Sequence, residues 1–134
     1  MASIEREISI AAHPDLVWDA LRDVGAIHTR LAPGFVTDTK LEPGARIVTF
    51  GNGMVAKELI LSVDERRRRV AWSVVGGRLT HHNASAQVFA VGDGTTRFVW
   101  IADILPGELE PAIAGMIEQG MLAMKAHLEK VAKG

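Results

Sequence analysis

The chain has 134 residues, of which 48% are apolar and 23% charged, and its formal net charge is -1. This length and apolar content predict one globular domain, 1–134, with a buried core, and they exclude a disordered protein. The balanced charge gives no electrostatic reason for a nucleic-acid partner, and the absence of cysteine excludes disulfide scaffolds, thiolate metal sites and cysteine nucleophiles.

The N-terminal part predicts one strand followed by two short helices. Apolar and polar residues alternate over 3–10, which is typical of a strand. The same segment is acidic where a secretory signal has a basic start and an apolar run, so we expect a cytoplasmic protein. Pro14 suits the first turn of a helix, and apolar residues at helical spacing continue it toward Gly25. A second short helix is expected over 26–31.

The middle of the chain predicts a run of antiparallel hairpins. The expected strands cover 35–41, 46–51, 54–63, 70–75, 81–91 and 95–105. Asn52-Gly53 is the strongest turn signal, because both central residues of a type I′ turn need a positive φ. A long helix follows over about 108–133, where apolar residues recur every three or four positions. No apolar run reaches the ~18–20 residues of a membrane-spanning helix.

The element order is β-α-α-β-β-β-β-β-β-α, which predicts an α+β fold. A twisted antiparallel sheet of this size must cover one face, and the long C-terminal helix is the element large enough to do so. One helix covers only part of a curved sheet, so we expect an internal cavity between the sheet and this helix.

Several local segments carry a resemblance to a known family. They are the segment 13–23 (HPDLVWDALRD), the segment 44–46 (GAR) with Glu58 and Asp64, and the segment 94–97 (GTTR) leading to Trp100. In this order they resemble the SRPBCC proteins, the polyketide cyclase/dehydrase and lipid-transport branch of the START / Bet v 1-like superfamily. The resemblance implies the helix-grip fold and a cavity that binds apolar molecules such as lipids, sterols, hormones or polyketides. Some members catalyse cyclisation or dehydration. Where related sequences often carry Trp-His, this chain has Leu31-Ala32.

Strand parity predicts which residues face the cavity in the first hairpins. A two-residue turn at Asn52-Gly53 places Ile47 opposite Glu58. One face then holds Ile47, Thr49, Ala56, Glu58 and Ile60, and the other holds Arg46, Val48, Phe50, Val55, Lys57 and Leu59. The first set buries one charge and the second buries two, so we expect the first set, with Glu58, to face inward.

The last hairpin gives a second register. A three-residue turn at 92–94 pairs Val91 with Thr95. The predicted inner pairs are then Val88 with Phe98, Ala86 with Trp100, Ala84 with Ala102 and His82 with Ile104. The outward set, which should be solvent-exposed, is Asn83, Ser85, Gln87, Arg97 and Asp103.

The leading functional hypothesis is binding of a small apolar molecule, either lipid-, polyketide- or aromatic-like, in this cavity. The expected lining residues are Glu58, Trp72, His82, Ala86, Phe98, Trp100, Met116, Ile117, Gly120 and Met124. Glu58 and His82 would set the polarity of the site. The alternatives are that Glu58 pairs with a nearby arginine and that the tryptophans are core residues. The sequence leaves the identity of the ligand open, as well as the choice between monomer and homodimer.

Two other hypotheses remain open. In a cyclase/dehydratase-type enzyme, Glu58 would remove a proton α to a carbonyl, and His82 would hydrogen-bond the enolate oxygen. This requires a Glu58 that is neither ion-paired nor outside the cavity. A partner-binding module would instead expose an apolar patch, for which Val99 and Ile101 are the only indication.

No metal or cofactor is predicted. His81 and His82 are adjacent strand residues and point to opposite faces, so they cannot bind one ion together. The arginines over 66–69 form a solvated turn, and the glycine-rich turns do not open helices, as a phosphate loop would.

Overall fold

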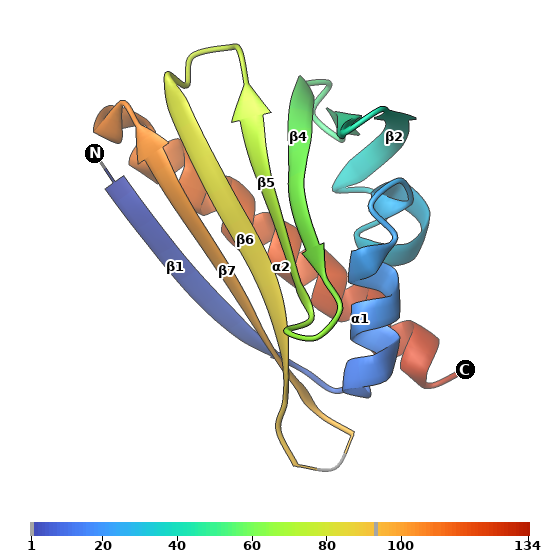
Figure 1. The fold of residues 1–134 in the computed structure, drawn as a ribbon. Helices are drawn as coiled ribbons and strands as arrows, with labels where there is room; N and C mark the ends of the chain where they lie inside the picture. Colours follow the sequence, from blue (N-terminus) through green and yellow to red (C-terminus); the bar gives the residue numbers. More distant parts are fainter. Residues whose placement is uncertain (1, 93) are drawn as a thin grey trace.

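The architecture is a curved antiparallel sheet with a long helix across one face (Figure 1). The computed structural model describes residues 2–92 and 94–134, and within them seven strands form one sheet in the order β1-β7-β6-β5-β4-β3-β2. In chain order the elements are β1 (Ala2–Ile10), α1 (Pro14–Arg22), η1 (Ile27–Leu31), β2 (Val36–Glu42), β3 (Ala45–Phe50), β4 (Val55–Asp64), β5 (Arg69–Val75), β6 (His81–Ala90), β7 (Thr96–Leu105), η2 (Gly107–Leu109) and α2 (Glu110–Ala132). This is the predicted helix-grip order.

Two helical segments differ in detail from the prediction. The second short helix is a single π-helical turn, η1. The C-terminal helix is preceded by the 3₁₀ turn η2, so α2 itself begins at Glu110 rather than at 108. No helix within residues 2–92 and 94–134 is long and apolar enough to cross a membrane.

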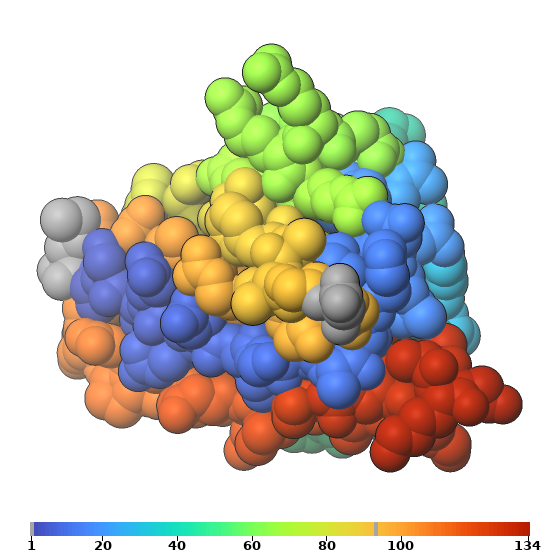
Figure 2. Space-filling view, turned by 90° about the horizontal axis from the view of Figure 1, so that it is seen from below, coloured from blue at the N-terminus to red at the C-terminus, as the bar shows by residue number. Residues whose placement is uncertain are grey.

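Helix α1 closes one end of the sheet. The Trp18 indole Nε1 donates to Glu65 Oε2 at 2.7 Å, and Arg22 Nε donates to Glu65 Oε1 at 2.7 Å. These contacts hold α1 against the turn between β4 and β5, and the Trp18 hydrogen bond and then Arg22 lower the pKa of Glu65. In the view from below, α1 lies beside the β6–β7 turn and next to the C-terminal turns of α2 (Figure 2).

The core lies between the inner face of the sheet and α2. Alternate residues of β6 and β7 are buried, as expected for strands with one covered face. Helix α2 buries Ile117, Met121, Met124 and Leu128 at helical spacing. Each such side chain contributes about 1.5–3 kcal/mol by leaving water, so α2 is held to the sheet mainly by this stripe.

The register of the β3–β4 hairpin is shifted from the prediction by one residue. Gly53 has φ +89° and its N–H donates to Phe50 O at 2.9 Å, while Phe50 N donates to Met54 O at 2.8 Å. The turn therefore contains three residues, 51–53, and not the two predicted. A three-residue hairpin loop with a left-handed last residue is a common alternative to the type I′ turn.

This shift exchanges part of the two predicted faces, because side chains alternate along a strand. Arg46, and not Ile47, lies opposite Glu58. Arg46, Val48 and Phe50 line the inner side together with Ala56 and Glu58. The predicted inward placement of Ile47 and Thr49 is wrong: both lie on the outer face of β3.

The predicted register of the last hairpin is confirmed. His82 pairs with Ile104, Ala86 with Trp100 and Val88 with Phe98, and Ala84 pairs with Ala102. Asp93 of the predicted turn lies outside the described residues. On the outer face Asn83 and Arg97 are exposed as expected, but Ser85 is only 8% exposed. Ser85 lies between Ala71 and Ile101 in the middle of the sheet, which explains its burial.

Candidate functional site

A cavity of about 160 Å³ lies between the inner face of the sheet, η1 and α2. Every residue of the set proposed from the sequence lines it, from Glu58 on β4 to Met124 on α2. The lining residues that sequence reasoning missed are chiefly Arg46, Val48 and Phe50 of β3, Phe35 before β2, and Leu21, Ile27 and Leu31 of the short helices. The β3 residues were missed because of the register shift. Among the lining residues, Arg46, Glu58 and His82 are those with a titratable side chain, and the others are aliphatic or aromatic.

Arg46 and Glu58 form a buried ion pair at one side of the cavity. Arg46 Nε donates to Glu58 Oε1 at 2.7 Å, and the two side chains are 7% and 8% exposed. Arg46 Nη1 also donates to Val24 O at 3.2 Å, and its guanidinium lies 5.5 Å from the centroid of the Trp72 ring. The pair carries no net charge, so this part of the wall is polar but electrically neutral.

The ion pair bears directly on the enzymatic hypothesis. To abstract a proton, the Glu58 carboxylate must not be paired with an arginine. In the structure it accepts a hydrogen bond from Arg46 Nε at 2.7 Å. The structure therefore does not meet the requirement set for Glu58 as a base, whereas the alternative of a pair with a nearby arginine is confirmed.

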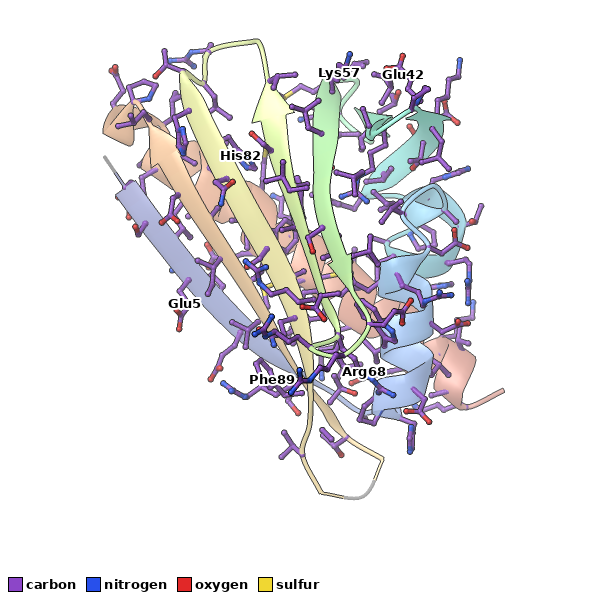
Figure 3. The ribbon with its side chains drawn as sticks, viewed as in Figure 1. Glu5, Glu42, Lys57, Arg68, His82 and Phe89 are labelled. Atoms are coloured by element: carbon purple, nitrogen blue, oxygen red, sulfur yellow. The ribbon has the colours of Figure 1, made fainter. Side chains whose placement is uncertain are left out.

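His82 lies on β6 (Figure 3). It supplies the other polar point of the cavity wall. The backbone N–H of Val74 donates to His82 Nδ1 at 3.0 Å, and the Ser73 hydroxyl donates to the His82 carbonyl oxygen. The residue is 7% exposed. Burial, and secondarily the neighbouring His81, lowers the pKa of His82 from 6.5 to about 4, so the ring is neutral near pH 7.

The two polar points occupy one row across the sheet. Arg46 lies opposite Glu58, Glu58 lies opposite Val74, and Val74 contacts His82. Glu58 on β4 and His82 on β6 therefore lie two strands apart, with β5 between them.

Aromatic rings form much of the remaining wall. Trp72 and Trp100 meet edge to face, with ring centroids 5.7 Å apart and an interplanar angle of 65°. Phe35 and Phe50 meet in the same way at 5.5 Å and 74°. A Cβ on Gly120 would lie 2.9 Å from Phe35 Cε2 and 3.2 Å from Trp100 Cζ3. Gly120 therefore allows α2 to approach these rings closely.

The structure also shows where the adjacent histidines and the residues of the partner-binding hypothesis lie. His81 is exposed while His82 is buried, as expected for adjacent strand residues, and the described part of the chain holds no cluster of three metal-ligating side chains. Val99 and Ile101 are half-buried opposite Glu7 and Glu5 of β1. The exposed apolar patch that a partner-binding module requires is not found at these positions.

Comparison with known proteins identifies the family. The family described as polyketide cyclase / dehydrase and lipid transport matches residues 1–129. The chain belongs to this family. The helix-grip architecture is thus that of a polyketide cyclase/dehydrase and lipid-transport family member. Among curated proteins, none matches the sequence significantly.

Solved structures share the fold of this family member. A protein from Thermobifida fusca is 28% identical with a TM-score of 0.77, over 93% of this chain and 91% of its own. A START superfamily protein from Mycobacterium smegmatis is 12% identical with a TM-score of 0.72, over 98% and 97%. The di-domain ARO/CYC protein BexL of the BE-7585A biosynthetic pathway is 18% identical with a TM-score of 0.86, over 100% of this chain and 48% of BexL.

Proposed function

We propose that this family member binds a small apolar molecule in the cavity between the sheet and α2. The observation that carries the proposal is a space of about 160 Å³ with an almost wholly apolar and aromatic wall. Side chains that line an open space lack the contacts that a filled core would give them. A concave space with an apolar wall and a few polar groups is the usual form of a small-molecule site, which supports a ligand-binding role.

The size of the space indicates the size of the ligand. An apolar cavity of ~150 Å³ holds one benzene molecule. A molecule with a single aromatic ring, or an acyl chain of similar volume, therefore fits the cavity as it stands. The edge-to-face pair of Trp72 and Trp100 favours a flat ring among these.

The cyclase/dehydratase alternative receives less support. The likeness to BexL supports a common fold and does not extend to a reaction. The Glu58 carboxylate, which this alternative uses as the base, is paired with Arg46. We therefore infer binding, and propose no reaction.

The test is a substitution that fills the cavity. Ala86 lies on its wall and is 1% exposed, so Ala86→Leu places three further carbon atoms in the space. With the one-ring hydrocarbon α-methylstyrene as probe, we expect the wild type to bind and Ala86→Leu to bind at least tenfold more weakly. Overpacking costs 1–3 kcal/mol, and circular dichroism checks that the variant is folded.

Gln87→Leu is the matched control, because Gln87 neighbours Ala86 on β6 and points to the opposite face. It should bind the probe as the wild type does. Binding is measured by titration in ¹H–¹⁵N correlation spectra, where shifts should concentrate on lining residues. A wild type without such shifts, or an Ala86→Leu variant that binds as tightly, would overturn the proposal.

A further inference from the structure

The His82 ring is held in one protonation form by its hydrogen bond to the backbone. The Val74 N–H donates to Nδ1 at 3.0 Å, and a nitrogen that accepts a hydrogen bond carries no proton. In a neutral imidazole the proton then lies on Nε2. Within residues 2–92 and 94–134 no hydrogen bond to Nε2 is found, although the residue is 7% exposed and lines the cavity. His82 therefore contributes to the cavity wall an N–H donor that has no acceptor among the described residues.

The charges on the wall restrict the ligand further. Arg46 and Glu58 neutralise each other at 2.7 Å, and both are almost fully buried. A charged ligand would place an uncompensated charge beside this buried, neutral pair, which costs several kcal/mol. The site therefore favours an uncharged ligand over a carboxylate or an amine.

The position of the donor distinguishes a carbonyl group from a hydroxyl group. A carbonyl oxygen only accepts, so its hydrogen bond from His82 Nε2 leaves no polar hydrogen unpaired. A phenol or alcohol at the same place would bring its own O–H into the apolar wall. The one carboxylate of the wall, Glu58, already accepts from Arg46, and an unpaired buried donor costs about 1–3 kcal/mol.

We propose that the ligand is an uncharged molecule of about one-ring size that carries an aryl ketone, aldehyde or ester carbonyl, and that His82 Nε2–H donates to this carbonyl oxygen. The inference rests on the proposed function, since it requires a ligand in this cavity. It makes His82 the residue that orients the ligand and sets its chemical class.

The test compares two probes that differ at one position. Acetophenone has a carbonyl oxygen where α-methylstyrene has a methylene group of similar size. His82→Asn keeps an acceptor near the Nδ1 position for the Val74 N–H but removes the atom that reaches the ligand. A net hydrogen bond of this kind corresponds to about fivefold to tenfold in affinity. We expect the ratio of acetophenone to α-methylstyrene affinity to fall by that factor in His82→Asn.

His81→Asn, on the exposed side of the same strand, is the control and should leave the ratio unchanged. Binding of α-methylstyrene shows that a variant retains a folded cavity. In the wild type, acetophenone should move the His82 Nε2–H proton resonance further downfield than α-methylstyrene does in ¹H–¹⁵N spectra of the imidazole, which tests the contact without any substitution.

The possible outcomes separate the two proposals. If α-methylstyrene binds but His82→Asn leaves the ratio unchanged, or benzoate binds as well as acetophenone, the inference about His82 is wrong and the proposed function stands. If neither neutral probe binds the wild type, the proposed function itself fails. Should His82→Asn not fold, an Nε2–H resonance in the wild type that acetophenone moves no further downfield than α-methylstyrene does is the result that overturns the inference.

Discussion

Replacing Glu58 with glutamine is expected to lower the free energy of unfolding by about 3–5 kcal/mol. Both side chains of the Arg46–Glu58 pair are less than one-tenth exposed. The substitution removes one charge and leaves the other buried without compensation, which is far more costly than losing the attraction of a solvated pair. Urea unfolding at pH 7, followed by tryptophan fluorescence, measures the loss as a lower midpoint.

An exposed arginine–glutamate pair with the same N–O distance provides the matched control. Arg97 donates to Glu7 at 2.7 Å, the same distance as in the buried pair, but the side chains are 46% and 56% exposed. Glu7→Gln should therefore cost less than about 1 kcal/mol. The double variant Arg46→Met/Glu58→Leu should recover most of the stability lost in Glu58→Gln, because no charge remains buried. Equal losses in Glu58→Gln and Glu7→Gln would show that water reaches the buried pair.

The fold could be predicted from the sequence because each element carries its own local signal. Alternation over 3–10 specifies the first strand, and Pro14 marks the start of α1. The long apolar stripe near the C-terminus specifies α2, and no other helix could cover the sheet. The last hairpin could even be placed in register, since its three-residue turn leaves small residues of β6 opposite Phe98 and Trp100 of β7.

The β3–β4 register could not be predicted in this way, because Asn52-Gly53 is compatible with two turns. Both the type I′ turn and the three-residue loop place Gly53 at a positive φ. They differ by one residue in length, and that residue decides whether Arg46 or Ile47 faces the cavity. The argument from buried charge counted Arg46 as a cost, whereas in the structure Glu58 compensates it.

The chemistry of the site depended on contacts that no sequence pattern encodes. Parity placed His82 on the inner wall, but the hydrogen bond from Val74 depends on how β5 and β6 separate beyond their last pair, Trp72 with Ala84. That hydrogen bond fixes which ring nitrogen carries the proton. The polar groups of the cavity thus depend on tertiary contacts. Its apolar lining, in contrast, follows from the alternation of apolar and polar residues along the strands.

The same burial makes His82 a source of pH-dependent stability. The pKa of His82 is about 4 in the folded chain and about 6.5 when unfolded. Below pH 6.5 the unfolded chain takes up a proton on His82 that the folded chain does not. The contribution of the neutral His82 ring to the free energy of unfolding is therefore fully present above pH 6.5 and is lost as the pH decreases toward 4. The free energy of unfolding is expected to fall by about 1.4 kcal/mol per pH unit over this range, and the total decrease approaches about 3 kcal/mol near pH 4. Urea unfolding at several values between pH 7.5 and 5 measures the slope.

Between pH 6.5 and 5, the effect of His82 on stability can be measured without a contribution from the carboxylates whose pKa values are lowered. Asp15, Asp64, Glu65 and Glu129 have lowered pKa values and therefore lose their stabilising contacts only as the pH falls below about 4.5. His82→Asn should flatten the slope between pH 6.5 and 5, because asparagine does not titrate and can still accept from Val74. His81→Asn, which replaces an exposed ring, should retain most of it. A His82→Asn variant with the wild-type slope would mean that the folded chain protonates His82 as readily as the unfolded chain does, and that the cavity wall is wetter than its apolar lining implies.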